Sequence, residues 1–467
     1  MRDFRFCCTI KTMRAQNELP PSDASLTIPL ILKGPFMKFK SRFCLLLFLV
    51  LMILPSRKMR ADAASSGRDG WQQDDSGSWY YYTGGKPASG WQTINSKTYY
   101  FDPSKGNAMA TGFTKIVTDG KTYTYYFMDQ DSISYTDAGL GQMLTGFKTI
   151  KRDGVNRAFY FADYRYKTLP RGSMLTGFKT ISGSKYYFAD YRYKAMPYGS
   201  RLSGWKTISG KKYYFADYRC PDWKVKGSFV TGFVLISDKA YFFSSSGVLD
   251  ETWASKHKIV IDPGHSSEIP DGEVPIGPGS KEMKEADNYG TQGISTGVHE
   301  YELNLTVSLK LRDALQKKGY KVVMVRTTNK GKYSCIARAE VANKNNAAVF
   351  LRVHANAAPK DHSKTGAMAL CISKKNPFIP KMYKSSRLLS DLILKNYVKA
   401  TGCFNEGVEE RDTLISNNWS KVPTTLIELG YMTNAKEDKL MQTKAYQTKM
   451  VTGLVNGIDA YFKETAK

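Results

Sequence analysis

Two histidines stand where apolar stretches of the sequence stop. The run 258–264 ends in Asp-Pro-Gly before His265, and the run 348–353 leads directly into His354. Runs of this length predict buried strands, and ligands of α/β folds collect at strand ends. A sharp Pro-Gly turn would present His265 at the end of a sheet. One such histidine could be incidental, but two together could bind a metal ion.

Two glutamates occupy settings that also suit chemistry. Glu300 opens a segment, 300–315, with apolar residues at helical spacing, and acidic residues are favoured at a helix start. That pattern alone describes a capped amphipathic helix. Glu428 lies inside a strand-like apolar run, 422–434. Burial would raise the pKa of its carboxyl and suit it to act as a general base; the alternative is a satisfied core carboxylate.

These elements follow one another in a recognisable order. The chain resembles the zinc-dependent N-acetylmuramoyl-L-alanine amidases of the family-3 type over roughly 256–462, on four motifs: DPGH at 262–265, EYELNL at 300–305, RVHAN at 352–356 and IELGYMTN at 427–434. The resemblance implies a C-terminal α/β zinc amidase domain, with a mixed sheet flanked by helices, which we place at 251–467.

The resemblance also implies roles for individual residues. Zinc would be held by His265, Glu300 and His354, and Glu428 would be the catalytic glutamate. Three protein ligands leave a fourth zinc position for water, whose pKa falls to about 7 there. Candidate substrate contacts are Arg411 and Asn356. The sequence departs from many family members at Ser266-Ser267, in place of Gly-Gly, and in an insertion at 268–298 that bears on the shape of the cleft.

The implied substrate is the amide that joins the lactyl group of N-acetylmuramic acid to L-alanine in peptidoglycan. The same ligands would serve a zinc peptidase that acts on stem peptides equally well. A catalytically inactive wall-binding surface protein is a third hypothesis, which the intact motif residues oppose. The adjoining repeats favour a peptidoglycan hydrolase of autolysin type.

Aromatic repeats fill the N-terminal half of the chain. From Gly70 to about Leu249 a unit recurs, made of Gly with Trp or Phe, a polar stretch and a Tyr/Phe triplet, at spacings of 20 to 34 residues. Segments such as 205–215 predict two short strands around a Ser-Gly turn. One hairpin cannot bury its aromatic residues alone. We therefore expect a β-hairpin solenoid over 64–250, stabilised between adjacent units.

The repeats resemble the choline-binding and glucan-binding repeats of bacterial surface proteins. In choline-binding members, aromatic residues of consecutive hairpins form a cage for a quaternary ammonium group. Here Phe replaces many leading Trp residues, and insertions such as 188–197 separate the units. These departures favour another wall glycan or an anionic polymer as the ligand, with most of the Tyr/Phe residues packed between hairpins.

Charge and cysteine content narrow the partners and the compartment. The formal net charge of +26 would attract nucleic acid, anionic lipid and teichoic acids alike. Charge therefore does not select a partner, and it is the repeats that predict a wall polymer rather than nucleic acid. Downstream of the leader, Cys220, Cys335, Cys371 and Cys403 have long, irregular spacings, which predicts thiols rather than disulfides.

Residues 1–63 have the order of a secretory signal. After a second possible start at Met37, basic residues precede an apolar run, 43–54, and Ala61-Asp-Ala63 follows. The run is shorter than the ~20 residues of a membrane-spanning helix. Basic residues at 57–60 leave an uncleaved anchor as the alternative. We predict a secreted, cell-wall-associated protein that contacts the membrane only through its leader during export.

Overall fold

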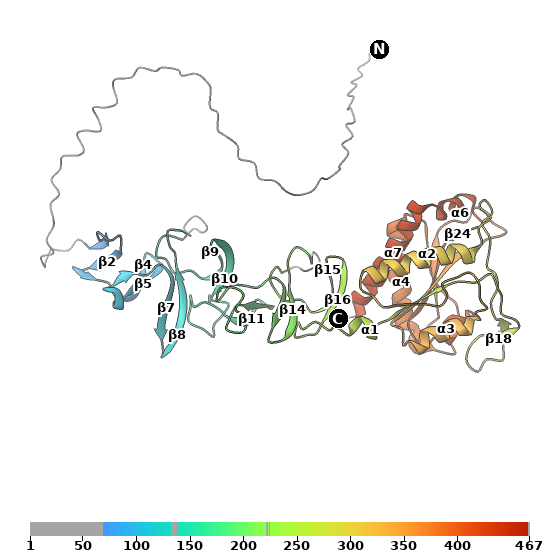
Figure 1. Cartoon of the computed structure of the whole chain (residues 1–467), viewed down its shortest axis with the longest axis horizontal. Helices are drawn as coiled ribbons and strands as arrows, with labels where there is room; N and C mark the ends of the chain where they lie inside the picture. Colours follow the sequence, from blue (N-terminus) through green and yellow to red (C-terminus); the bar gives the residue numbers. More distant parts are fainter. Residues whose placement is uncertain (1–68, 132–137, 221–222, 224, 466–467) are drawn as a thin grey trace, which may run out of the picture. The chain divides into compact units, whose positions relative to one another are not determined.

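The computed structural model describes residues 69–131, 138–220, 223 and 225–465 (Figure 1). The predicted export signal, 1–63 with its start at Met37, lies outside the described residues. Within the described part, no helix is both long enough and apolar enough to cross a membrane.

Antiparallel hairpins make up the repeat region. Two three-stranded units come first, β1(Gly70–Gln73), β2(Trp79–Thr83) and β3(Lys86–Pro87), then β4(Gly90–Ile94), β5(Lys97–Asp102) and β6(Ala108–Met109), with a 3₁₀ turn, η1(Pro103–Lys105). Five two-stranded hairpins follow: β7(Gly112–Thr118) with β8(Lys121–Phe127), β9(Gly146–Arg152) with β10(Val155–Phe161), β11(Gly177–Ile181) with β12(Ser184–Phe188), β13(Gly204–Ile208) with β14(Lys211–Phe215), and β15(Gly232–Ile236) with β16(Lys239–Phe243).

The predicted hairpin turns and inter-unit packing are both confirmed. At the tip of β13–β14, Ser209 and Gly210 have φ of 49° and 74°, the left-handed pair of a type I′ turn. Aromatic residues of one hairpin pack on the next, since Tyr126 joins Phe159 and Phe161 in one buried cluster. Each unit therefore gains its core from its neighbour, as expected of a solenoid.

The C-terminal part contains a six-stranded mixed sheet in the order β20-β17-β21-β24-β22-β23. β22 runs antiparallel to β24, and the other neighbours are parallel. The strands are β17(Ile259–Pro263), β20(Val322–Met324), β21(Val349–Asn356), β22(Ala367–Cys371), β23(Asn405–Glu410) and β24(Thr424–Tyr431). This is the mixed α/β sheet that the resemblance implied.

Helices cover both faces of this sheet (Figure 1). On one face lie α2(Glu300–Lys317), α4(Tyr383–Thr401) and α7(Lys444–Thr465), and on the other α3(Cys335–Lys344) and α5(Ile415–Trp419). Short elements complete the domain: α1(Trp253–Lys256), η3(Pro380–Met382), α6(Ala435–Met441) and a separate hairpin, β18(Glu273–Pro275) with β19(Met283–Glu285). Successive residues of β17 point to opposite faces of the sheet. Ile259 and Ile261 therefore pack in the hydrophobic core under α2, α4 and α7, and Val260 packs in the core on the face of α3 and α5.

The last hairpin shares the core of the α/β domain. Phe233 of β15 lies with its ring centroid 5.6 Å from that of Trp253 and 6.2 Å from that of Phe462. The backbone N–H of Ala240 donates to the carbonyl of Lys318 at 2.9 Å. The hydrophobic core of the catalytic domain thus includes side chains of β15 and β16, which lie before the predicted domain boundary at residue 250.

The four cysteines named above form no disulfide among the described residues, as their spacing predicted.

Candidate active site

The sheet brings the two predicted histidines together. β17 and β21 are parallel neighbours, so residues at their carboxyl ends meet at one edge of the sheet. His265 follows β17 with φ of 58°, a left-handed conformation that a non-glycine residue adopts at a cost and that is common at functional sites. His354 lies within β21 and is buried. The two rings are 4.8 Å apart between centroids.

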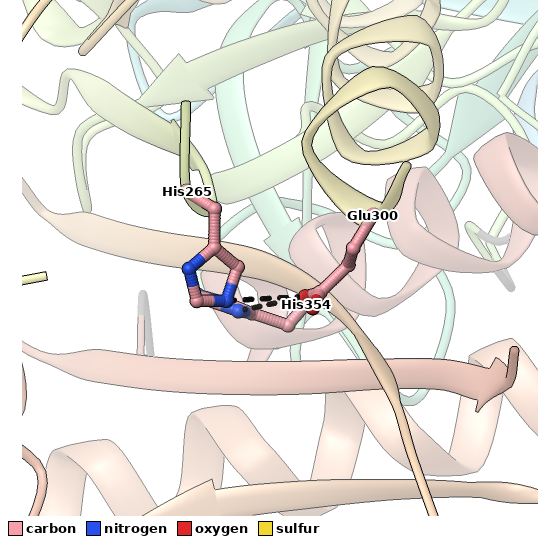
Figure 2. Close-up of side chains that lie close together, drawn as sticks. All are labelled: His265, Glu300 and His354. Carbon is pink, nitrogen blue, oxygen red and sulfur yellow. Dashed lines mark hydrogen bonds and ion pairs between the residues drawn. The ribbon is translucent and has the colours of Figure 1, made fainter. Parts of the chain in front are cut away.

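Glu300 completes the group from the first turn of α2. One ligand atom each of His265, Glu300 and His354 lies within 4.8 Å of the others, and Figure 2 shows the three side chains pointing toward one another. Glu300 Oε1 is 3.4 Å from His265 Nε2 and 3.2 Å from His354 Nδ1. The α2 start is fixed locally, because His299 N–H donates to Glu302 Oε2 at 3.0 Å.

Other groups hold the Glu300 carboxylate in place. Its Oε1 accepts hydrogen bonds from Asn304 Nδ2 and from the backbone N–H of Ala355, both at 3.1 Å. Its Oε2 accepts the backbone N–H of Thr291 at 3.0 Å. Asn304 stands one helical turn after Glu300 on the same face, so its position could have been recognised in the sequence.

The electrostatics of the group depend on burial and on this carboxylate. Burial acts to raise the pKa of Glu300, but the two histidines hold it well below its usual range. Burial acts to lower the pKa of His265, yet Glu300 and Asp287 raise it to about 10. Burial lowers the pKa of His354 to about 4. Near neutral pH, these values describe an ionised Glu300, a protonated His265 and a neutral His354. Binding of a metal ion would release the extra proton of His265, because a ligating imidazole is neutral.

This donor set fits a metal ion. Two imidazoles and one carboxylate, with nitrogen and oxygen atoms converging on one point, are the ligands of many three-residue catalytic zinc sites. Asp287 Oδ1 lies 3.2 Å from His265 Nδ1, and the carbonyl of Asn288 lies 2.8 Å from the same nitrogen. Because Nδ1–H of His265 donates to these acceptors, His265 Nε2 is left to face the cluster. The group can therefore hold a metal ion.

Glu428 lies beside this group on the next strand. It is the register partner of His354 in the parallel pair β21–β24. Its side chain is half-buried, and its Oε2 is buried with no hydrogen-bond partner in the described part of the chain. Burial, and then the negative charge of Glu300, raise the pKa of this carboxyl to about 8. An unpartnered carboxyl in this place is available for proton transfer.

A buried ionic network behind the site was missed by the sequence analysis. Asp262 accepts from Arg338 Nη1 at 2.7 Å and from Arg352 Nε at 3.1 Å, with all three side chains buried. Arg338 Nε also pairs with Asp287 at 2.9 Å. Arg352 Nη2 lies 3.3 Å from His354 Nε2. Arg352 could have been noticed, since it stands two residues before His354 on the same strand face, but Asp287 lies in the 268–298 insertion and has no such signal.

The two candidate substrate contacts are not members of the three-residue cluster. Arg411 follows β23 and pairs with Glu409 at 2.7 Å, with both side chains exposed. Its charge still acts to lower the pKa of Glu428. Asn356 ends β21, where its Nδ2 lies 3.4 Å from Met368 Sδ. Their contacts with substrate stay predictions.

Comparison with known proteins identifies the two parts. The family described as "N-acetylmuramoyl-L-alanine amidase" matches residues 259–460. Residues 259–460 form an N-acetylmuramoyl-L-alanine amidase domain. The "putative cell wall binding repeat" matches at 69–83, 89–104, 176–190 and 203–217. The predicted amidase and wall-binding repeats are therefore confirmed, and the chain is a peptidoglycan hydrolase.

Several amidases are similar to the amidase domain. An N-acetylmuramoyl-L-alanine amidase of Mycobacterium tuberculosis is 26% identical over 44% of this chain and 85% of its own length. The germination-specific N-acetylmuramoyl-L-alanine amidase of Bacillus subtilis is 25% identical over 51% of this chain and 94% of its own. The crystal structure of N-acetylmuramoyl-L-alanine amidase from Clostridium difficile 630 matches with 25% identity and a TM-score of 0.37, covering 44% of this chain and 97% of that one.

Proposed function

We propose that this amidase is secreted, stays associated with the cell wall, and uses zinc held by His265, Glu300 and His354 to cleave the amide between N-acetylmuramic acid and L-alanine. The observation that carries the proposal is the convergence of these donors within 4.8 Å, next to the unpartnered carboxyl of Glu428.

The chain's own residues supply the proton transfers. Zinc, when bound, would polarise the scissile carbonyl and lower the pKa of a coordinated water. Glu428 takes a proton from the attacking water and returns it to the departing amine of L-alanine. A pKa raised to about 8 places this carboxyl near the range where a group can both accept and return a proton at neutral pH. Asp287 and Asn304 fix the orientation of His265 and of Glu300.

The proposed domain organisation assigns the remaining parts to delivery. Residues 1–63 would be the export leader, 64–250 the wall-binding repeats and 251–467 the catalytic domain. Holding the enzyme on the wall raises the effective concentration of its insoluble substrate. Cell-wall polymer is thus the partner of the repeats, nucleic acid is not a partner, and membrane contact occurs only through the leader during export. Arg411 and Asn356 would contact the stem peptide.

The zinc assignment can be tested by metal removal and by histidine substitution. Chelation should abolish turnover of soluble muropeptides, and added zinc should restore it. His265→Ala and His354→Ala should lose bound zinc and activity together. The matched control is His362→Ala, because His362 is an exposed histidine outside the cluster, and this variant should keep both. Full turnover by stringently metal-free enzyme would contradict the assignment.

A further inference from the structure

A five-residue segment, Phe-Ala-Asp-Tyr-Arg, follows three successive hairpins. It occupies 161–165 after β10, 188–192 after β12 and 215–219 after β14. Its contacts recur in each copy. In the first copy, the Tyr160 hydroxyl donates to Asp163 at 2.6 Å and Arg165 Nη2 pairs with Asp163 at 2.5 Å. The same partners recur as Tyr187, Asp190 and Arg192, and as Tyr214, Asp217 and Arg219.

The tyrosine of each segment is displayed to solvent. Tyr164, Tyr191 and Tyr218 are 77%, 75% and 85% exposed, among the large side chains left uncovered in the repeats. The following arginine backs each ring, with Cζ 5.3 to 5.6 Å from the ring centroid. Because the carboxylate fixes that arginine, the ring stands on a preorganised support, and little side-chain freedom remains to be lost on binding.

The tyrosine–aspartate contact that follows each hairpin forms without the exposed tyrosine and its neighbouring arginine. After β8, the Tyr126 hydroxyl donates to Asp129 at 2.6 Å, the same tyrosine–aspartate contact. Gln130 and Asp131 stand there in place of the tyrosine and arginine. The exposed ring and its guanidinium are therefore an addition to the turn, made three times at intervals of 27 residues.

Basic residues surround the displayed ring of the first segment, where the surface is hollowed. A hollow of about 740 Å³ beside the first segment is lined by Phe147, Tyr164, Tyr166, Lys148, Lys167 and Arg171. The Asp163–Arg165 pair also lines it, so Asp163 is its single carboxylate against four basic groups. Flat aromatic faces suit the apolar faces of sugar or polyol units. The excess of cations suits phosphate or carboxylate groups and disfavours a quaternary ammonium.

We propose that the three Phe-Ala-Asp-Tyr-Arg segments are related subsites for an anionic glycopolymer of the cell wall. Each displayed tyrosine stacks on a sugar or polyol unit while neighbouring Lys and Arg side chains bind its acidic groups. Three weak subsites on one chain bind a repeating polymer with avidity. The inference rests on the proposed wall-targeting role of the repeats, and it assigns that role to a surface separate from the aromatic contacts between hairpins.

Binding of the full-length chain to purified Gram-positive sacculi tests this proposal, measured in the cold with a chelator present to prevent hydrolysis. The variant replaces Tyr164, Tyr191 and Tyr218 with alanine. A second triple variant carries phenylalanine at these positions and keeps the rings. The matched control replaces Val117 and Val155, which are also exposed in the repeats, with alanine. Melting temperature and turnover of soluble muropeptides confirm that each variant is folded.

The alanine variant should bind on the order of 10²-fold more weakly, the scale of a lost multivalent contact. The phenylalanine variant and the control should bind normally. Sacculi stripped of phosphodiester-linked polymers by hydrofluoric acid should lose binding as well, and soluble poly(glycerol phosphate) should compete where neutral dextran does not.

Normal binding by the alanine variant would overturn the subsites while leaving wall targeting intact. Undiminished binding to stripped sacculi, together with no competition by soluble poly(glycerol phosphate), would overturn the anionic ligand. No retention of the unmodified chain on sacculi would overturn targeting itself. Loss of single-stranded DNA binding in the alanine variant, without loss of poly(glycerol phosphate) binding, would assign the surface to nucleic acid instead.

Discussion

Gly290 should be indispensable to the metal site, although it donates no ligand. It has φ of 75°, and a Cβ built on it would lie 2.7 Å from His265 Cδ2 and closer still to Glu300 Oε2. Ordinary contacts begin at 3.4 Å, so the imidazole would have to retreat by about 0.7 Å. Metal sites tolerate roughly 0.2 Å in ligand distance. Gly290→Ala should therefore weaken zinc binding and turnover at least as much as losing an outer-shell partner does, about 10- to 100-fold.

A second glycine in the same insertion provides a control that distinguishes the steric clash of an added Cβ from the strain of a left-handed alanine backbone. Gly272 has φ of 81°, but a Cβ there would have no neighbour within 4 Å. Gly272→Ala thus imposes a left-handed alanine, at ~1–2 kcal/mol, without touching the site. Zinc content, melting temperature and turnover of soluble muropeptides should be measured on both variants. Gly272→Ala should lose a few degrees of Tm and keep its zinc, and Gly290→Ala with the same zinc affinity and turnover would refute the collision.

Three further predictions concern the base, the repeats and acid stability. Glu428→Gln should stay folded and zinc-loaded while kcat falls by roughly 10² to 10⁴, and near-normal turnover in such a sample would place the base elsewhere. A fragment of residues 232–467 should cut soluble muropeptides normally but act poorly on sacculi, and equal activity of this fragment and the full chain on sacculi would exclude targeting. A fragment of residues 252–467 should in addition be less stable, because the burial of Phe233 contributes about 1.5–3 kcal/mol to the free energy of unfolding. Burial acts to raise the pKa of Asp262, but Arg338 and Arg352 lower it to about 2. The stabilisation of the fold by ionised Asp262 is therefore complete above the pKa near 4 of an aspartate in the unfolded chain, and it is lost as pH falls toward 2. The difference in unfolding free energy between the natural chain and Asp262→Asn should shrink by roughly 2 kcal/mol from pH 5 to pH 2, and a constant difference would contradict the linkage.

Elements with strong periodic patterns were predictable from the sequence. Continuous apolar runs gave β17, β21 and β24, and helical spacing gave α2, because burial leaves these patterns in any sequence that folds this way. The meeting of His265 and His354 followed from their places at the ends of two strands, whereas the family resemblance added Glu300 to them. Glu428 was recognisable because a carboxylate is rare within such an apolar run.

Contacts made by irregular segments could not be predicted in the same way. Asp287 reaches His265 from the 268–298 insertion, where no periodicity fixes the path of the chain. The packing of Phe233 on Trp253 joins a repeat hairpin to the catalytic domain, and hairpin spacing alone does not reveal it. The exposure of Tyr164 and its counterparts was also hidden, since their sequence differs little from that of the buried aromatic triplets beside them.

Mass spectrometry of muropeptides digested by the zinc-loaded enzyme is the most direct test of the central claim. The products should be free stem peptides with an unblocked L-alanine amino group, together with glycan fragments whose N-acetylmuramic acid residues carry a free lactyl carboxyl group. Those masses would come from cleavage of the lactyl–L-alanine amide. Stem peptides shortened but still joined to muramic acid would identify a peptidase and contradict the assignment, and unchanged muropeptides would identify an inactive wall-binding protein.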